Sequence, residues 1–176
     1  MKLEHSALIV VDLNAAIQKI VSHPYPYSWV EIEANNRALM SYFLAENCPV
    51  FVTSVQPKIL PKSWGKAFGR QLITDIAGVE EVIKFGPSIF TQSDAGLAEK
   101  LKAQGITKVF FSGISTSNGV FKSAKDAVAE QGFDVVLVRD ATADRNASGY
   151  EKIIKDEFPK IGEIQTTVEI LMKNER

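Results

Sequence analysis

Two polar turns, each directly after an apolar run, carry the residues best suited to chemistry. Asp12 follows the apolar residues 7–11 and offers a carboxylate, which can donate or accept a proton. Residues 115–118, with the sequence Ser-Thr-Ser-Asn, follow the apolar residues 109–113 and precede a helical pattern. Backbone N–H groups at the start of a helix bind anions, so this strand–turn–helix junction is a candidate ligand site.

Asp12, Lys84 and Cys48 also have ordinary structural explanations. An aspartate at the end of a buried strand commonly caps the next helix or turns the chain. A lone lysine such as Lys84, within the short strand predicted at residues 81–85, is most often a solvated surface charge. Cys48 lies at the turn before the strand predicted at residues 50–55, on the sheet edge that faces away from active sites in α/β proteins, so it is a poor candidate nucleophile.

Apolar runs alternate with amphipathic segments along the chain, and this alternation predicts the elements that position the candidate residues. Strands are expected at residues 7–11, 50–55, 81–85, 109–113, 135–138 and 164–166. Helices are expected at about 30–46, 94–105, 120–128 and 148–157. Residues 15–21 form either a short helix or an ordered loop.

This alternation predicts an α/β fold with three layers, α/β/α, in which a doubly wound parallel sheet of about six strands lies between helices. Right-handed crossovers leave few topologies, and the strand order 3-2-1-4-5-6 is the natural candidate. That order places Asp12, at the end of the first strand, beside the turn at residues 113–119 after the fourth strand. The proximity favours a functional role for Asp12 over that of a simple cap.

Two loops are candidates to cover such a site. Residues 23–29 contain two prolines and three aromatic residues, and they form a stiff loop that either closes a pocket or packs on the edge of the sheet. Residues 56–78 form a long irregular segment that contains Trp64 and Phe68. Loops of this length in compact domains are usually functional.

Composition and charge narrow the class of protein. The 176 residues are 45% hydrophobic and 23% charged, as expected for one globular domain over residues 1–176. The net charge of −1 gives no basic surface for nucleic acids or membranes. Asp12 interrupts the first apolar run too early for a signal peptide or membrane span, and the single cysteine fits a reducing compartment. We therefore expect a cytoplasmic protein that acts on a small molecule, with neither nucleic acid nor membrane as partner.

In order and spacing, the motifs resemble those of the isochorismatase-like hydrolases, a superfamily that also contains nicotinamidases and N-carbamoylsarcosine amidases. The resemblance covers nearly the whole chain. Residues 7–12 resemble the first strand with its catalytic aspartate, and residues 68–72 followed by 82–84 resemble the approach to the catalytic lysine. The similarity continues in the Ser-x-Phe motif at residues 88–90, the Gly-x-x-Thr-x-x-Cys-Val loop at 113–120 and the Asp-Ala pair at 140–141.

The resemblance implies catalytic roles for individual residues. Asp12 and Lys84 are expected to be catalytic, together with Gly119 in the loop. The backbone N–H groups of Ser115 and Gly119 are expected to form an oxyanion hole, next to a cis peptide bond between Ile114 and Ser115.

The resemblance also implies the substrate contacts, which are expected from Ser115, Asn14, Gln56, Phe68 and Trp64. The metal site of the nicotinamidases requires an aspartate and paired histidines after the second strand. The sequence there reads Ser-Val-Gln-Pro, and its two histidines stand elsewhere, at positions 5 and 23. Neither a metal nor another cofactor is therefore expected.

Gly119 stands where the amidases keep their nucleophilic cysteine, so the covalent acyl-enzyme route is closed to this chain. True isochorismatases resemble this chain in having glycine there, and they often have a Gln-Pro pair like that at Gln56. Their reaction protonates a vinyl ether, and water then completes cleavage to pyruvate and an alcohol. Asp12 would supply the proton and Lys84 would position Asp12. One departure is Ser115, where isochorismatases place an aromatic residue.

Three hypotheses remain open at this point. The first is an isochorismatase-type hydrolase that acts on a small anionic enol ether without a thiol intermediate. The second is a catalytically silent member that binds a small ligand or a partner through the same pocket. The third is an amide hydrolase without a thiol. The habit of the family implies a homodimer or homotetramer.

Overall fold

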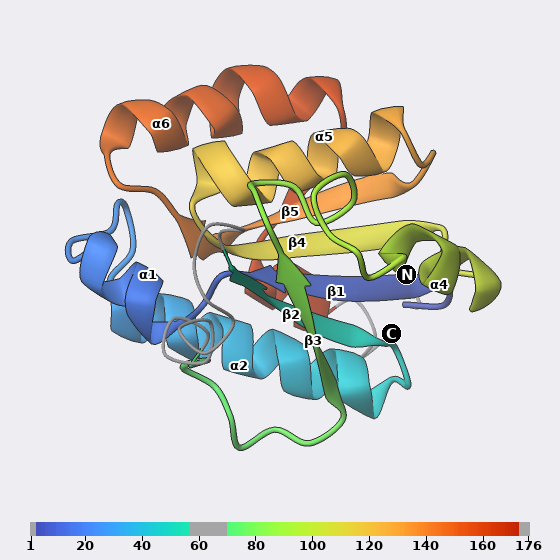
Figure 1. The fold of residues 1–176 in the computed structure, drawn as a ribbon. Helices are drawn as coiled ribbons and strands as arrows, with labels where there is room; N and C mark the ends of the chain where they lie inside the picture. Colours follow the sequence, from blue (N-terminus) through green and yellow to red (C-terminus); the bar gives the residue numbers. More distant parts are fainter. Residues whose placement is uncertain (1–2, 57–69, 173–176) are drawn as a thin grey trace.

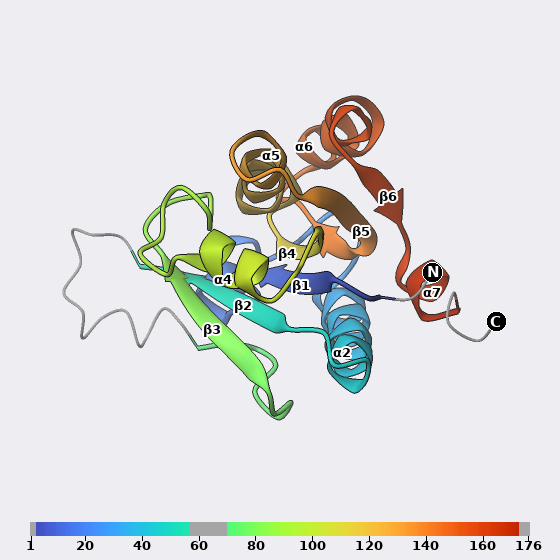
Figure 2. The ribbon, with the colours of Figure 1, turned by 90° about the vertical axis from the view of Figure 1, so that its right-hand side faces the viewer.

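The computed structural model describes residues 3–56 and 70–172. The six strands are parallel and lie in the order β3-β2-β1-β4-β5-β6, which confirms the predicted order 3-2-1-4-5-6 (Figure 1 shows β1–β5, and Figure 2 all six). Their bounds are β1 Ser6–Val11, β2 Val50–Val55, β3 Val79–Lys84, β4 Lys108–Ile114, β5 Asp134–Ala143 and β6 Glu163–Gln165.

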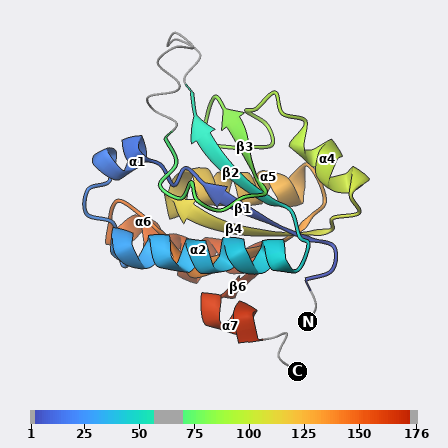
Figure 3. The same ribbon diagram turned by 90° about the horizontal axis from the view of Figure 1, so that it is seen from below.

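Helices cover both faces of the sheet. Helices α2 and α7 lie on one face, and α4, α5 and α6 lie on the other (Figures 2 and 3). Their bounds are α1 Ala15–Ile20, α2 Trp29–Ala45, α4 Leu97–Ala103, α5 Phe121–Ala129, α6 Ala147–Lys152 and α7 Thr167–Met172. A π-helical turn, η1 (Thr116–Val120), leads into α5, and α6 continues through η2 (Ile153–Glu157) and η3 (Phe158–Lys160). The predicted three-layer α/β/α architecture is thus confirmed.

Strand β1 shows why the apolar runs fold as central strands. Successive side chains of a strand point to opposite faces, so Leu8 and Val10 pack with α2 while Ala7, Ile9 and Val11 pack on the opposite face. All five are fully buried. A parallel strand covered on both faces needs a continuous apolar run, and that is the pattern in the sequence.

Helix α2 is fixed at its start and along its buried side. The Ser28 hydroxyl accepts from the Glu31 N–H, and the Glu31 carboxylate accepts from the Ser28 N–H, which together form a capping box. Farther along, the buried Asn36 side chain donates to the Ala141 carbonyl and accepts from the Ser112 hydroxyl. These bonds tie α2 to both β4 and β5 close to their carboxyl ends.

The carboxyl-terminal third differs from the prediction. Strand β5 continues to Ala143, because an irregularity in pairing between Phe111 and Gly113 lets β5 pair a second time with the end of β4. Polar residues 139–140 hide this continuation in the sequence. The short helix α7 was also not predicted, and the Asp140 carboxylate accepts from the Thr167 N–H and hydroxyl at its start. Among the described residues, no helix has the length and apolar character needed to cross a bilayer.

Candidate functional site

A cavity of about 290 Å³ opens at the carboxyl ends of the strands. This is the sheet edge on which α1 lies in Figure 1. Parallel strands bring their carboxyl ends to one edge, so the residues that follow β1, β4 and β5 meet the ends of β2 and β3 there. The cavity is lined by Asp12, Ile17, Ile20, Val21, Val55, Lys84, Gly86, Pro87, Ile114, Ser115, Asn118, Gly119 and Arg145.

Asp12 and Lys84 form a buried ion pair at the floor of this cavity. The Lys84 Nζ lies 2.8 Å from the Asp12 Oδ2, and the two side chains are only 1% and 6% exposed. Asp12 adopts a left-handed backbone conformation with φ 49°, which aspartate tolerates better than most residues. The Thr53 hydroxyl on β2 donates to the Asp12 Oδ1 over 2.7 Å and accepts from the Asp12 N–H over 3.1 Å. The carboxylate is therefore held from two sides.

Lys84 is held by the loop that follows β3. Its Nζ donates to the Pro87 carbonyl over 3.0 Å and to the Gly86 carbonyl over 3.3 Å, in addition to its contact with Asp12. The three donor positions of the ammonium are thus occupied. The Gln92 side chain accepts from the Ser88 N–H, which secures the same loop. The lysine that looks like a surface charge in the sequence is therefore a fixed part of the site.

Burial decides the acidity of Asp12. Its pKa is raised above the usual value for aspartate because the carboxyl group is buried, and this effect outweighs the opposing influence of Lys84 and Thr53. A raised pKa keeps the proton on the carboxyl group at a higher pH than on an exposed aspartate. The geometry therefore suits Asp12 to donate a proton into the cavity.

Gly119 faces the ion pair from the turn η1. A Cβ built on Gly119 would lie 3.3 Å from the Lys84 Nζ, 3.5 Å from the Asp12 Oδ2 and 3.0 Å from the Val11 Cγ1. A side chain at this position would therefore lie directly beside both members of the ion pair. With glycine, the space that such a side chain would fill belongs to the cavity that both groups line.

The turn itself is rigidly connected to the sheet. The Ile114–Ser115 peptide bond is cis, as the family resemblance implies. Just before it, Gly113 has φ 99°, and a Cβ there would lie 2.1 Å from the Val11 carbonyl oxygen, so glycine is required. The buried hydroxyl of Thr142 donates to the Gly113 carbonyl and is bonded to the Thr116 hydroxyl.

The structure brings together some of the predicted site residues and not others. Asp12, Lys84, Gly119 and Ser115 all line the cavity. Asn14 does not, because its side-chain oxygen caps α1 by accepting from the Ile17 N–H over 3.0 Å.

The remaining predicted contacts lie at the edge of residues 57–69, or within that range, which is outside the described residues. Gln56 donates its N–H to the Lys84 carbonyl and is not a lining residue, while Phe68 and Trp64 lie outside the described residues. For Asn14, Gln56, Phe68 and Trp64, a role in binding substrate stays a prediction.

Several lining residues were not predicted as site residues from the sequence, among them Arg145 and three residues at α1. Arg145 reaches the cavity because β5 extends to Ala143, which brings the next residues to the same edge as Asp12. Ile17, Ile20 and Val21 come from α1 and the residue after it, and Ile20 is 57% exposed. The sequence signal for this apolar wall was weak, because residues 15–21 read equally well as helix or loop.

The residues present do not fit the metal site of the nicotinamidases. Within residues 3–56 and 70–172, no three histidine, cysteine, aspartate or glutamate side chains gather as metal ligands would. His5 lies at the amino end of β1, at the opposite edge of the sheet from the cavity.

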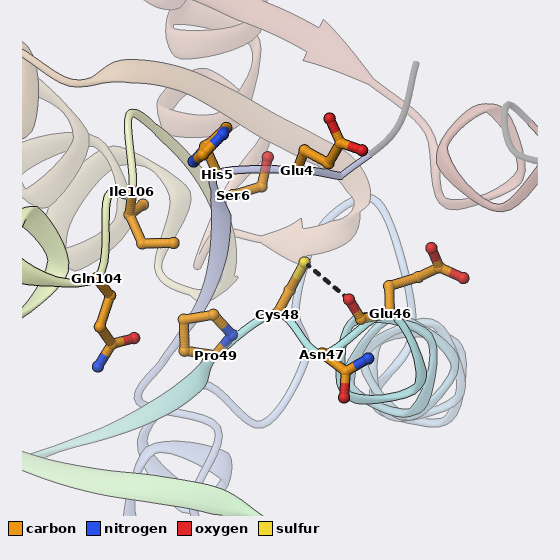
Figure 4. Close-up of a pocket in the computed structure, with 9 residues that line it drawn as sticks. All are labelled: Glu4, His5, Ser6, Glu46, Asn47, Cys48, Pro49, Gln104 and Ile106. Carbon is orange, nitrogen blue, oxygen red and sulfur yellow. Dashed lines mark hydrogen bonds between the residues drawn. The ribbon is translucent and has the colours of Figure 1, made fainter.

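Cys48 lies at that opposite edge, where Figure 4 shows a second cavity of about 190 Å³. Its Sγ donates to the Leu3 carbonyl over 3.2 Å and faces the Glu46 carbonyl at 3.7 Å. Burial, and then the nearby charge of Glu46, raise the pKa of the Cys48 thiol. A buried thiol with a raised pKa is a poor nucleophile, in agreement with its place before β2.

Comparison with known proteins places the chain in one family. Residues 6–169 match the isochorismatase domain family. YecD, an isochorismatase family protein of Escherichia coli O157:H7, is 30% identical over 186 residues, covering 94% of each chain. An isochorismatase family protein from Burkholderia thailandensis superposes with a TM-score of 0.73 at 24% identity, covering 94% of this chain and 93% of that one.

An isochorismatase from Pseudomonas putida KT2440 superposes with a TM-score of 0.77 at 17% identity, covering 96% of this chain and 91% of that one. At these identities the two structures establish the fold. The family is established by the match of residues 6–169 and by the relative that aligns over nearly the full length. The protein whose strand ends enclose Asp12, Lys84 and Gly119 is thus a member of the isochorismatase family of hydrolases.

Proposed function

We propose that this protein is an isochorismatase-type hydrolase that cleaves a small anionic enol ether by general-acid catalysis, without a covalent thiol intermediate. One observation carries the proposal. The buried pair of Asp12 and Lys84 lines a cavity beside Gly119, the position from which a cysteine side chain would contact both of them. An acid is present and a thiol is not, so the chemistry that suits this site is proton donation.

The proposed reaction begins with protonated Asp12. The carboxyl group gives its proton to the terminal carbon of the R–O–C(=CH₂)–COO⁻ substrate, which becomes an oxocarbenium ion with a methyl group. Water adds to the cationic carbon and returns one proton to the Asp12 carboxylate. The resulting hemiketal collapses to pyruvate and the alcohol R–OH, so the sum of the steps is the addition of one water molecule. Once deprotonated, Asp12 also stabilises the cation electrostatically.

The other groups at the site have distinct roles in this proposal. Lys84 positions the Asp12 carboxyl group, since the Pro87 and Gly86 carbonyls fix the ammonium that holds it. Arg145 binds the carboxylate of the substrate, because this residue lines the cavity and its guanidinium forms no ion pair within the described part of the chain. The apolar wall of Ile17 and Ile20 contacts the rest of the substrate.

The hydroxyl groups of the turn are poor substitutes for the missing thiol. The Thr116 hydroxyl is fully buried and bonded to Thr142. Ser115 lines the cavity, but among the described residues no histidine lies there to activate its hydroxyl. This arrangement supports acid catalysis over amide hydrolysis by a replacement nucleophile.

The direct test is pyruvate release from isochorismate, followed with lactate dehydrogenase and NADH. Turnover that depends on Asp12 supports the proposal. Hydrolysis of nicotinamide or of carbamoyl compounds, without pyruvate release, would support the amide hydrolase instead. Ligand-induced thermal stabilisation with no product from either group would identify a silent member of the family, and the proposal would then be wrong.

Replacing Arg145 should weaken substrate binding more than it slows chemistry. We expect Arg145→Ala to raise KM for isochorismate by about 10- to 100-fold, the loss of one or two charged hydrogen bonds, with a smaller change in kcat. Steady-state kinetics measure both constants. Arg139→Ala is the matched control, since Arg139 is exposed on β5 and is not a cavity residue. An unchanged KM in Arg145→Ala would contradict the assigned role.

The pH dependence should report the protonation of Asp12. Only the protonated carboxyl group can donate, so kcat/KM should fall as the pH rises through the raised pKa of Asp12. Lys84 lowers that pKa, so Asp12 should stay protonated to a higher pH in Lys84→Met. The falling limb of the residual activity should therefore move up by about one to three pH units. Lys100→Met, which removes a surface lysine paired with Glu80, should leave the profile unchanged. A falling limb that stays in place, or moves to lower pH, in Lys84→Met would rule out Asp12 as the titrating acid.

A further inference from the structure

A second buried carboxylate, that of Asp144, lies just behind the cavity wall. Asp144 directly follows β5 and is only 3% exposed. Its Oδ2 accepts from the Ser117 N–H over 2.6 Å, and its Oδ1 accepts from the Arg145 N–H over 2.7 Å. No salt bridge to Asp144 is found within the described residues, so backbone donors satisfy this carboxylate. Hydrogen bonds to a charged acceptor are stronger than neutral ones, which makes this a firm connection.

The two backbone groups that Asp144 holds belong to two walls of the cavity. Ser117 lies in η1 between the lining residues Ser115 and Gly119, and Arg145 is itself a lining residue. The backbone of Asp144 also exchanges hydrogen bonds with Tyr25, in both directions. Asp144 therefore connects the turn η1, the cationic residue Arg145 and the loop that precedes α2.

The packing around Asp144 allows little movement. A Cβ built on Gly149, in α6, would lie 2.9 Å from the Asp144 Oδ1 and 3.1 Å from the Ser117 Oγ. The start of α6 therefore packs closely against both the Asp144 carboxylate and the turn η1. Asn146 caps α6 by accepting from the Gly149 N–H, and its side chain makes no hydrogen bond to the turn within the described residues.

We propose that Asp144 is a positioning residue, which holds Arg145 and the 115–119 turn in the arrangement that binds a carboxylate in the cavity. This inference rests on the proposed function in one respect, that the cavity takes a small carboxylate. Asp144→Asn keeps the shape of the side chain but turns an amide N–H₂ toward one of the two backbone N–H groups. One of the two connections is then lost, and the cavity wall loosens on that side.

Positioning and simple electrostatics predict opposite results. Asp144 is negative and lies near the cavity, so its neutralisation removes repulsion and would by charge alone strengthen binding of an anion. If Asp144 positions the cationic wall, the same substitution weakens binding of an anion and leaves a neutral ligand of the same shape nearly unaffected. The direction of the change therefore decides between the two.

The experiment is an NMR titration of the full chain with benzoate, and with benzamide as the uncharged probe of the same shape. We expect Asp144→Asn to bind benzoate at least about tenfold more weakly, the loss of about one charged hydrogen bond, with benzamide binding changed less than about twofold. Asn146→Ala is the control, which weakens the same helix start without touching the turn, and both of its affinities should stay at the wild-type values.

A second variant keeps the test decisive if Asp144→Asn does not fold. Gly149→Ala leaves the carboxylate in the chain and displaces it, so benzoate binding should again weaken while benzamide binding does not. Unchanged or tighter benzoate binding in the variants would overturn the role of Asp144 and leave the proposed hydrolysis standing. No benzoate binding by the wild type would contradict the carboxylate cavity itself, and the role of Asp144 with it.

Discussion

Asp12→Asn should abolish pyruvate release from isochorismate, with kcat lowered by about 10²- to 10⁴-fold, the contribution of a general acid. The amide has the shape of the carboxyl group and has no acidic proton to give to carbon. The variant also loses the carboxylate that, once deprotonated, would stabilise the cationic intermediate. Pyruvate formation at saturating isochorismate measures the effect.

Loss of stability must be separated from loss of chemistry in this variant. Removing one partner of a buried ion pair costs about 3–5 kcal/mol, because the other charge stays buried without its partner. Thermal unfolding and ligand binding should therefore be measured beside activity, at a temperature where the variant is folded. Asp140→Asn is the matched control, since Asp140 caps α7 and is not a cavity residue. A folded Asp12→Asn protein with wild-type kcat would refute the assignment of the acid.

Gly119→Cys should lower pyruvate release and introduce a reactive thiol. The new Cβ would lie 3.3 Å from the Lys84 Nζ, and an adjacent ammonium lowers the pKa of a thiol. The Cβ would also lie 3.0 Å from the Val11 Cγ1, a contact that a shift of a few tenths of an ångström relieves. Because sulfur fills the space beside Asp12, pyruvate release should fall by about 100-fold, the typical cost of misplacing a reactant.

Alkylation by iodoacetamide at pH 7, followed by mass spectrometry, measures the reactivity of the new thiol. We expect it to react at least about ten times faster than Cys48, which is buried and whose pKa is raised. Gly119→Ala is the control for the added volume, and it should lose pyruvate release without gaining a reactive site. Slow labelling of a folded Gly119→Cys protein would show that position 119 does not face Lys84.

The sheet could be predicted from the sequence because its strands obey a strong constraint. A parallel strand with helices on both faces is mainly apolar, so β1, β2 and β4 each appear as a short, predominantly apolar run. Handedness of the crossovers then leaves few strand orders, and the predicted one is observed. The end of β5 was missed because Arg139 and Asp140 interrupt its apolar run at the surface.

The site could be predicted only in part, for a related reason. The motifs pointed to Asp12 and Lys84, and the strand order explains why they meet. Arg145 and Asp144 were missed because both depend on where β5 ends, and no spacing in the sequence fixes that point. The acidity of Asp12 was also out of reach, since burial and the charge of Lys84 act in opposite directions and only the packed structure decides between them.

The most direct test of proton donation to carbon is turnover of isochorismate in D₂O, with the pyruvate analysed at early times by NMR and mass spectrometry. If Asp12 protonates the terminal carbon, wild-type protein should release pyruvate with one deuterium in its methyl group, and Asp12→Asn should release almost none. Pyruvate formed at the same rate by both proteins would contradict the role of Asp12. No pyruvate from the wild type would show that the cavity performs a different reaction or none.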